Sequence, residues 1–367
     1  MTNRRETALK TIEEVKLEHF ERRAQFRESL FAQPVLHNLF LELTLRCNLR
    51  CEHCGSRCGD VVSDELSLET YRDFLGKIKR DFGTRGLMLC ITGGEPLLRK
   101  DFFDIMACAR DLGFAWGMTS NATLIDREVA RRLYETGMKT ISVSIDGLPE
   151  THDALRGVRG AYDRAMRGID ALLGQGGFGE VQVTTVVTHR SIQELDKIYE
   201  IMKSIDIDSW RLTGIEPIGR ALEHPEQMLT PDDHRQLLRF IKEERLKGMP
   251  LSYGCCHFLG TEFEREVRDW YFLCGAGRCV ASVTAGGAIR ACLDIERTPE
   301  TLQGNILRDD FTEVWRSGFR TFRRSLAEES ATCRACPHRR LCDGGSRHSW
   351  DEARGEQRVC MRGILFD

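Results

Sequence analysis

Residues 38–54 read Asn-Leu-Phe-Leu-Glu-Leu-Thr-Leu-Arg-Cys-Asn-Leu-Arg-Cys-Glu-His-Cys, and this stretch decides the fold. Its first eight residues form an apolar run typical of a buried strand. The loop that follows places Cys47, Cys51 and Cys54 in the spacing C-x3-C-x2-C. Three thiolates can hold three irons of a four-iron cubane and leave the fourth iron open. A zinc site closed by Cys58 or His53 explains the same spacing, so the spacing alone leaves both metals open.

Five more strand-like runs follow Asn38–Leu45, separated by segments whose apolar residues recur at helical spacing. They are Leu87–Thr92, Phe114–Thr119, Thr140–Ile145, Val181–Val187 and Trp210–Thr213. Strands that alternate with helices predict parallel pairing through right-handed crossovers. Because a closed barrel needs eight units, these six predict an α/β fold of the partial (β/α)6 TIM-like type.

Glycine, polar and thiol side chains gather where these strands end. In chain order they are Cys47, Gly93, Gly94, Glu95, Pro96, Ser120, Asn121, Ser144, Asp146 and Glu216. The carboxyl ends of parallel strands lie on one face, where proteins of this class build their sites. The sequence therefore predicts a single site at that face.

Composition limits the remaining possibilities. Lys and Arg number 53 against 56 Asp and Glu, a net charge of −3, which provides no general attraction to nucleic acid or an anionic membrane. No apolar run approaches the ~20 residues of a membrane span, and the charged N-terminus does not resemble a secretory signal. We therefore expect a cytoplasmic protein. In that reducing compartment its 15 cysteines indicate metal or redox chemistry.

The chain divides into three predicted parts. Residues 1–37 form a charged helical extension, and residues 38–254 contain the alternating strands and helices. In residues 255–367 the alternation stops and Gly and Cys become frequent. Because this last part has little apolar sequence for a core, we expect metal ligation by its thiols to stabilise it.

The order of the motifs resembles that of the radical S-adenosylmethionine (radical SAM) family, whose defining motif is C-x3-C-x2-C after the first barrel strand. The resemblance implies that Cys47, Cys51 and Cys54 bind a 4Fe-4S cluster whose open iron binds SAM. Gly93-Gly94-Glu95-Pro96 resembles the GGEP motif, which binds the amino group of the methionine moiety.

Three further segments extend this resemblance to the SAM site. Ser120-Asn121 is similar to the SNG motif, although Ala122 replaces its glycine. Ser144 and Asp146 resemble the strand residues that reach the ribose and carboxylate of SAM. Arg156, in the segment H-D-x-x-R-G, is implied to act against the SAM carboxylate.

The later cysteines are similar to the SPASM extension of that family, which holds two auxiliary 4Fe-4S clusters. The resemblance implies that the first binds Cys274, Cys279 and Cys292, and the second binds Cys333, Cys336, Cys342 and Cys360. A zinc ribbon remains the alternative for the C-x2-C pair at 333–336.

One position departs from the SPASM pattern. The family has another cysteine four residues after Cys342, where this chain has Ser346. The first auxiliary cluster then has an open iron, a different fourth ligand, or is smaller or absent, so one or two auxiliary clusters are expected. Candidate replacement ligands are Asp343, Ser346, His348, Cys255 and Cys256.

The resemblance implies an enzyme that reductively cleaves SAM to a 5′-deoxyadenosyl radical, which abstracts hydrogen from a ribosomally made peptide or a protein side chain. The alternatives are oxidation of a small molecule, such as a tetrapyrrole side chain or cofactor precursor, and a non-enzymatic iron–sulfur electron carrier. Glu216 and His189 follow strands and are the candidate catalytic groups, although both equally suit a surface.

The expected partners follow from this chemistry. A flavodoxin- or ferredoxin-type reductant is expected to supply electrons. Only about 36 residues precede the barrel, about half of what a fused peptide-recognition domain of the winged-helix type needs. A leader peptide would therefore bind a separate protein or the barrel itself.

Overall fold

The computed structural model describes residues 12–59, 64–254 and 256–367. It confirms the six predicted strands, which are β1 (Asn38–Glu42), β2 (Met88–Thr92), β3 (Ala115–Ser120), β4 (Met138–Ser144), β5 (Glu180–Val187) and β6 (Ser209–Gly214). The helices between and after them are α2 (Leu68–Phe82), α3 (Phe102–Asp111), α4 (Arg127–Glu135), α5 (Pro149–Arg156), α6 (Ala161–Gln175), α7 (Leu195–Ser204) and α8 (Pro231–Leu246).

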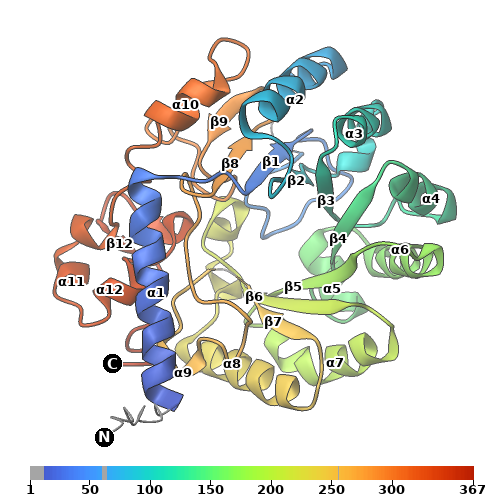
Figure 1. Cartoon of the computed structure of the whole chain (residues 1–367). Helices are drawn as coiled ribbons and strands as arrows, with labels where there is room; N and C mark the ends of the chain where they lie inside the picture. The colour runs from blue at the N-terminus through green and yellow to red at the C-terminus, as the bar shows by residue number, and fades with distance from the viewer. Residues whose placement is uncertain (1–11, 60–63, 255) are drawn as a thin grey trace, which may run out of the picture.

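The sheet extends beyond the six predicted strands at both edges. Strand β7 (Leu251–Tyr253) pairs in parallel with β6, and β8 (Val280–Val283) pairs in parallel with β1. Two antiparallel strands, β9 (Ala288–Arg290) and β10 (Gly304–Asn305), complete a ten-stranded open sheet in the order β10-β9-β8-β1-β2-β3-β4-β5-β6-β7 (Figure 1). The sheet therefore continues across the predicted boundary at 254/255, which stays a prediction.

Local sequence explains why these elements form. In α2, Ser67 caps the N-terminus by accepting from Thr70, and Tyr71, Phe74 and Ile78 recur on the buried face. Helix α8 begins with a capping box between Thr230 and Asp233. Strands β2 and β6 alternate half-buried and buried residues. Trp116 packs against Phe102 of α3 and Trp210 against Phe240 of α8, so both fill the core between sheet and helices.

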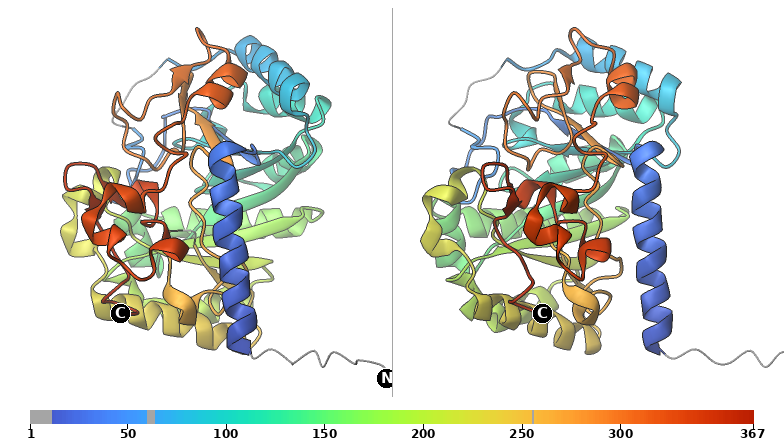
Figure 2. Two further views of the ribbon diagram at one scale, coloured as in Figure 1. Left: turned by 60° about the vertical axis from the view of Figure 1, so that its left-hand side comes forward. Right: turned by 90° about the vertical axis from the view of Figure 1, so that its left-hand side faces the viewer.

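The C-terminal region returns to the N-terminal part of the chain. Its helices are α9 (Gly260–Phe263), α10 (Phe311–Ser317), α11 (Ala331–Arg334) and α12 (Arg339–Cys342), followed by the short pair β11 (Trp350–Asp351) and β12 (Glu356–Gln357). Helix α1 (Ile12–Ala32) runs alongside this region (Figure 2), and Arg27 donates to the Leu341 carbonyl at 2.9 Å. Residues 1–11 of the predicted helical extension lie outside the described residues.

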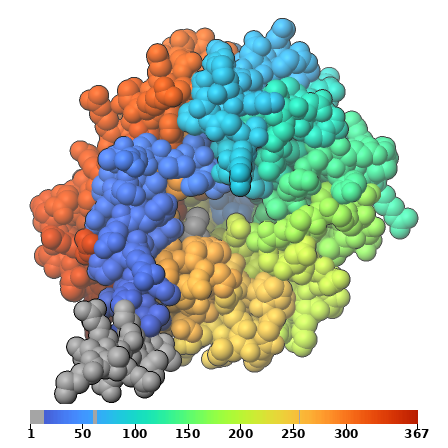
Figure 3. Space-filling view, in the orientation of Figure 1, coloured from blue at the N-terminus to red at the C-terminus, as the bar shows by residue number. Residues whose placement is uncertain are grey.

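A second contact joins the C-terminal region to α2, the helix between β1 and β2. Helix α10 packs against α2 (Figure 3), where the Phe311 and Phe74 rings meet edge to face with centroids 5.6 Å apart. The Thr312 hydroxyl donates to Asp81 at 2.7 Å. These contacts hold α10 against the helix that connects β1 to β2.

Candidate functional site

The three cysteines of the first motif line one pocket in the loop after β1. Each sulfur accepts at least one hydrogen bond. The Leu49 amide donates to Cys47 Sγ at 3.4 Å, the Cys58 amide to Cys54 Sγ at 3.3 Å, and Arg156 Nη1 to Cys51 Sγ at 3.6 Å. Donors aimed at sulfur stabilise thiolates and tune the potential of a cluster that the thiolates bind. A hydrogen bond from the Cys58 side chain lowers the pKa of Cys54 to about 6.

Two glycines bring the loop after β2 against the cysteine loop. A Cβ at Gly94 would lie 2.1 Å from the Arg46 carbonyl oxygen and 2.9 Å from Cys47 Cβ. A Cβ at Gly93 would lie 2.5 Å from the Thr44 carbonyl oxygen. Only glycine permits this approach, so both residues are needed to hold the cysteine loop in place.

Glu95 supports the pocket from behind, where its side chain is fully buried. Its carboxylate accepts from the Ser120 hydroxyl at 3.0 Å, the Asn121 amide at 2.9 Å and the Leu97 amide at 3.3 Å. Burial raises the pKa of Glu95 to about 7 even though these donors favour its charged form. The GGEP-like and Ser-Asn segments are therefore joined through one carboxylate.

In the loop after β3, Ala122 adopts a backbone conformation that favours glycine, the residue that the SNG motif has at this position. Ala122 has a φ of 55°, in the left-handed region that favours glycine. Its amide donates to the Ser120 hydroxyl at 2.9 Å, and the Asn121 side chain donates to Asn48 at 2.9 Å. The alanine therefore leaves the Ser-Asn pair in position beside the cysteine loop.

Arg156 reaches the pocket through a buried ion pair. Its guanidinium donates to Asp146 Oδ2 at 2.6 Å, and the other oxygen of Asp146 accepts from the Val186 amide at 3.0 Å. His53 Nε2 lies 3.5 Å from Asp146 Oδ2, the oxygen that accepts from Arg156. His53 therefore faces Asp146, and burial lowers its pKa to about 4.

The structure brings most of the predicted SAM-site residues to this one pocket. Its lining includes Cys47, Cys51, Cys54, Gly93, Gly94, Ser120, Asn121, Ser144 and Arg156. Glu95 and Asp146 stand behind that lining and hold it through hydrogen bonds, and Pro96 begins a short helical turn, Pro96–Leu98. Three thiols, a backbone cradle without side chains and polar groups on the opposite wall fit a three-cysteine cluster with a bound SAM.

Arg220 belongs to this site, although the sequence supported no role for it. From the turn Gly219–Glu223 after β6, its Nε donates to the Cys51 carbonyl at 2.8 Å, and its Nη2 to the Cys58 carbonyl at 3.1 Å. An arginine in a loop has no distinctive pattern, because its partners are backbone groups about 160 residues earlier in the chain.

The four cysteines assigned to the second auxiliary cluster also converge. Cys333, Cys336, Cys342 and Cys360 line one pocket together with the Phe258 and Phe366 rings. Burial raises the pKa of Cys342, and the neighbouring thiols of Cys360 and Cys333 raise it further. Thiols that resist ionisation when crowded and buried become good ligands once a metal supplies positive charge.

The cysteines assigned to the first auxiliary cluster lie around the β8–β9 pair. Cys279 precedes β8, and Cys292 follows β9, which pairs antiparallel with β8. Cys274 lies near Cys279, and the Arg347 amide donates to Cys274 Sγ at 3.5 Å. Ser346, where the SPASM pattern has a further cysteine, directly precedes the residue that contacts Cys274.

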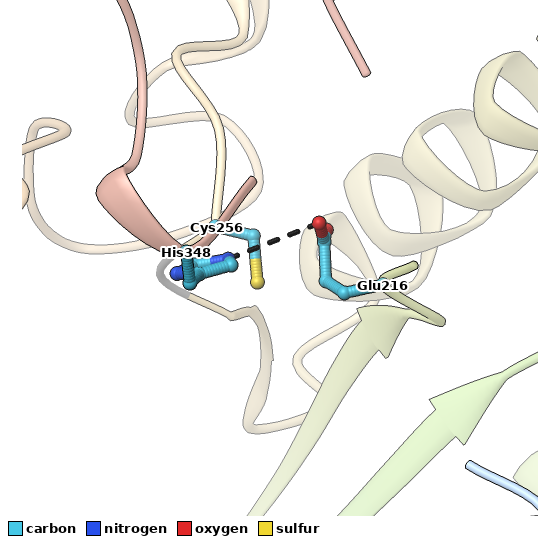
Figure 4. Close-up of side chains that lie close together, drawn as sticks. All are labelled: Glu216, Cys256 and His348. Carbon is cyan, nitrogen blue, oxygen red and sulfur yellow. Dashed lines mark ion pairs between the residues drawn. The ribbon is translucent and has the colours of Figure 1, made fainter. Parts of the chain in front are cut away.

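The other candidate ligands divide into two groups. Asp343 is engaged elsewhere, since it pairs with Arg278 at 3.2 Å and accepts from Ser325 at 2.6 Å. Cys256 and His348 lie together with Glu216, each contributing a ligand atom within 4.8 Å of the other two (Figure 4). Cys255 lies outside the described residues.

The two candidate catalytic residues have different surroundings. Glu216 is buried, and its Oε1 lies 2.6 Å from His257 Nε2. His189 does not face the pocket as the sequence suggested. Its side chain is 53% exposed and contacts Asp233 at 2.6 Å, at the start of α8. His257 was missed because it follows β7, whose three residues are too short to detect from periodicity.

Comparisons with known proteins agree with this geometry. Residues 41–202 match the radical SAM superfamily, and residues 274–337 match SPASM, an iron–sulfur cluster-binding domain. The AdoMet-dependent heme synthase of Nitratidesulfovibrio vulgaris is 30% identical over 278 residues, which cover 70% of this chain and 73% of that protein. Mycofactocin maturase MftC of Mycobacterium tuberculosis is 31% identical over 316 residues, covering 83% and 76%.

Solved structures share the fold. Streptococcus suis SuiB bound to S-adenosylmethionine superposes with a TM-score of 0.70 at 18% identity, covering 90% of this chain and 77% of that one. The anSMEcpe structure with bound AdoMet gives a TM-score of 0.68 at 20% identity, covering 88% of this chain and 92% of that one.

Among the described residues, no helix is long and apolar enough to cross a bilayer.

Proposed function

This chain belongs to the radical SAM superfamily and carries a SPASM domain, and from that premise we propose that it matures a ribosomally made peptide or a protein side chain. It is a radical SAM enzyme whose cofactors are 4Fe-4S clusters and S-adenosylmethionine. When bound and reduced, the cluster held by the first three cysteines would supply the one electron that cleaves SAM to methionine and a 5′-deoxyadenosyl radical, the species that abstracts a hydrogen atom from the substrate.

The single observation that supports this chemistry is the shared pocket. Cys47, Cys51 and Cys54 line it together with Gly93 and Gly94, which pack against the cysteine loop. The glycines leave backbone carbonyls accessible to an ammonium group, and Glu95 behind them supplies negative charge. Arg156 offers a guanidinium to a carboxylate. The chain therefore positions the two charged ends of an amino acid against the cysteine loop.

The charge balance of a neighbouring groove favours a peptide. This groove lies beside Cys54. Its lining consists of residues 55–57, 218–219, 222, 293–297 and 358. Its three arginines are each paired with an acid: Arg57 with Glu223, Arg297 with Glu42, and Arg358 with Glu296. A tetrapyrrole that carries several carboxylates would need unpaired cations, whereas a peptide suits a balanced surface with apolar Ile218 and Leu222.

Small-molecule modification is the second candidate because relatives of similar identity are named heme synthases. A further relative, from Methanosarcina barkeri, is named Fe-coproporphyrin III synthase and is 26% identical over 333 residues. Oxidation of a tetrapyrrole side chain would use the same SAM pocket and differ only in what the neighbouring groove admits. A flavodoxin- or ferredoxin-type reductant, and a separate leader-binding protein, belong to the peptide proposal as expected partners.

Anaerobic reconstitution tests the proposal. The loaded enzyme, reduced with dithionite in the presence of SAM, is expected to form 5′-deoxyadenosine. Peptides encoded beside its gene are expected to increase that rate and to gain a new mass, whereas iron coproporphyrin III is not. A rate increase with the porphyrin alone would establish the second candidate. Fully loaded clusters that form no 5′-deoxyadenosine would instead favour an electron carrier.

A further inference from the structure

Three side chains from distant segments meet between the barrel and the SPASM region. Glu216 follows β6, Cys256 follows β7, and His348 lies in the turn Arg347–Ser349. Their ligand atoms lie within 4.8 Å of one another, and the three side chains lie close together, with an ion pair between His348 and Glu216 (Figure 4). His348 Nε2 and Glu216 Oε2 are 3.8 Å apart, and the two side chains are only 11% and 9% exposed.

The two oxygens of the Glu216 carboxylate have different surroundings. Oε1 contacts His257 Nε2 at 2.6 Å. Oε2 is buried and has no hydrogen-bond partner among the described residues, and its ion pair with His348 Nε2 is long, at 3.8 Å. Because a buried carboxylate oxygen without a hydrogen bond is costly, the position of Oε2 near His348 and Cys256 favours a ligand between the three groups.

We propose that Glu216, Cys256 and His348 bind one divalent metal ion of the zinc type. One carboxylate oxygen, one thiolate and one imidazole form the three-ligand set of an open zinc site, whose fourth position stays available. The two negative ligands balance a doubly charged ion, which explains how they share a buried site. His257 fixes the Glu216 carboxylate from behind, as outer hydrogen bonds do in metal sites.

The site stands where the chain departs from the SPASM pattern. The Ser346 hydroxyl lies 3.4 Å from His348 Nε2, and the next residue, Arg347, donates its amide to Cys274. His348 therefore lies two residues after Ser346, the position at which the SPASM pattern has a cysteine. Glu216 follows a barrel strand at the same edge as the SAM pocket, so the open position would bind a carbonyl, carboxylate or thiolate of the substrate.

Metal content and zinc X-ray absorption of the reconstituted full-length enzyme test this inference. After incubation with ZnCl2 and removal of the excess, we expect about one zinc per chain with a single sulfur at about 2.3 Å. Glu216→Gln, His348→Ala and Cys256→Ser should each weaken zinc binding by at least about tenfold. Cys256→Ser should also remove the sulfur signal, whereas Cys90→Ser, in β2, should bind zinc like the parent.

The zinc measurement does not depend on SAM cleavage. The zinc inference can therefore fail while the proposed function stands. Zinc with three or four sulfur neighbours would mean that it occupies an empty cluster site, and would overturn the inference. Equal zinc binding by all variants, or no zinc in the parent, would do the same. Loss of auxiliary-cluster iron in His348→Ala, without bound zinc in the parent, would make His348 a cluster ligand instead. Circular dichroism of each variant checks that it is folded.

Discussion

Arg156 donates to Asp146 over 2.6 Å, and the same guanidinium reaches the Cys51 sulfur at 3.6 Å. Asp146 is fully buried, and Arg156 is 8% exposed. The ion pair of Arg156 with Asp146 therefore connects the end of β4 to the cysteine loop that follows β1.

Removing the charge of Asp146 should destabilise the fold. Asp146→Asn leaves the buried Arg156 guanidinium without its anion, a loss of about 3 kcal/mol in the free energy of unfolding. Anaerobic urea denaturation measures it. Asp170→Asn, at an exposed position of α6, is the control and should change stability by less than about 0.5 kcal/mol. Equal stability of both variants would contradict a structural role for the pair.

Removing the positive charge of Arg156 should make the first cluster harder to reduce. A reduced cluster carries more negative charge, which a guanidinium beside Cys51 stabilises. Arg156→Met should therefore lower the midpoint potential by on the order of tens of millivolts. Redox titration followed by electron paramagnetic resonance measures this shift. An unchanged or higher potential would show that the guanidinium does not act on the cluster.

SAM affinity should increase as the pH rises through about 7. The pKa of Glu95 is raised to about 7, so the carboxylate is mostly protonated at pH 6 and mostly charged at pH 8. A charged Glu95 attracts the SAM ammonium more strongly. Calorimetric titration should show weaker binding at pH 6, and Glu95→Gln should remove the part of the dependence due to Glu95. Identical pH profiles for the two proteins would refute this assignment.

A methyl group at Gly94 should prevent assembly of the first cluster. Gly94→Ala places a Cβ 2.1 Å from the Arg46 carbonyl oxygen, so the cysteine loop must move. Iron analysis should show a loss of about four irons per chain. Gly76→Ala, in α2 with nothing within 4 Å of the new Cβ, should retain all iron and gain about 0.5–1 kcal/mol of stability. Full iron in Gly94→Ala would contradict the cradle.

The second auxiliary cluster should be separable from the first. Cys342→Ala removes a buried thiol from the pocket of Cys333, Cys336 and Cys360, and should cost about four irons. The cluster signal that shifts on SAM addition should persist, because Cys47, Cys51 and Cys54 line a different pocket. Loss of that SAM-dependent signal would mean that the two sites fold together.

The local pattern of the chain determined the six parallel strands, the cysteine motifs and the face on which they meet. Strand periodicity and motif order are short-range properties, because residues within one loop or strand carry them. They were enough to predict Cys47, Cys51 and Cys54 beside Gly93 and Gly94. The same local reading missed β7, whose three residues show no periodicity, and with it His257.

Only the tertiary structure decided which side chains act together. Glu216 and His189 looked alike as polar residues after strands, yet one is buried against His257 and the other is half-exposed beside Asp233. Ser346 and Cys274 are brought together by folding across more than 70 residues, as the Arg347 amide contact with Cys274 shows. Burial and long-range contact depend on the packing of the whole chain, which no single segment of sequence specifies.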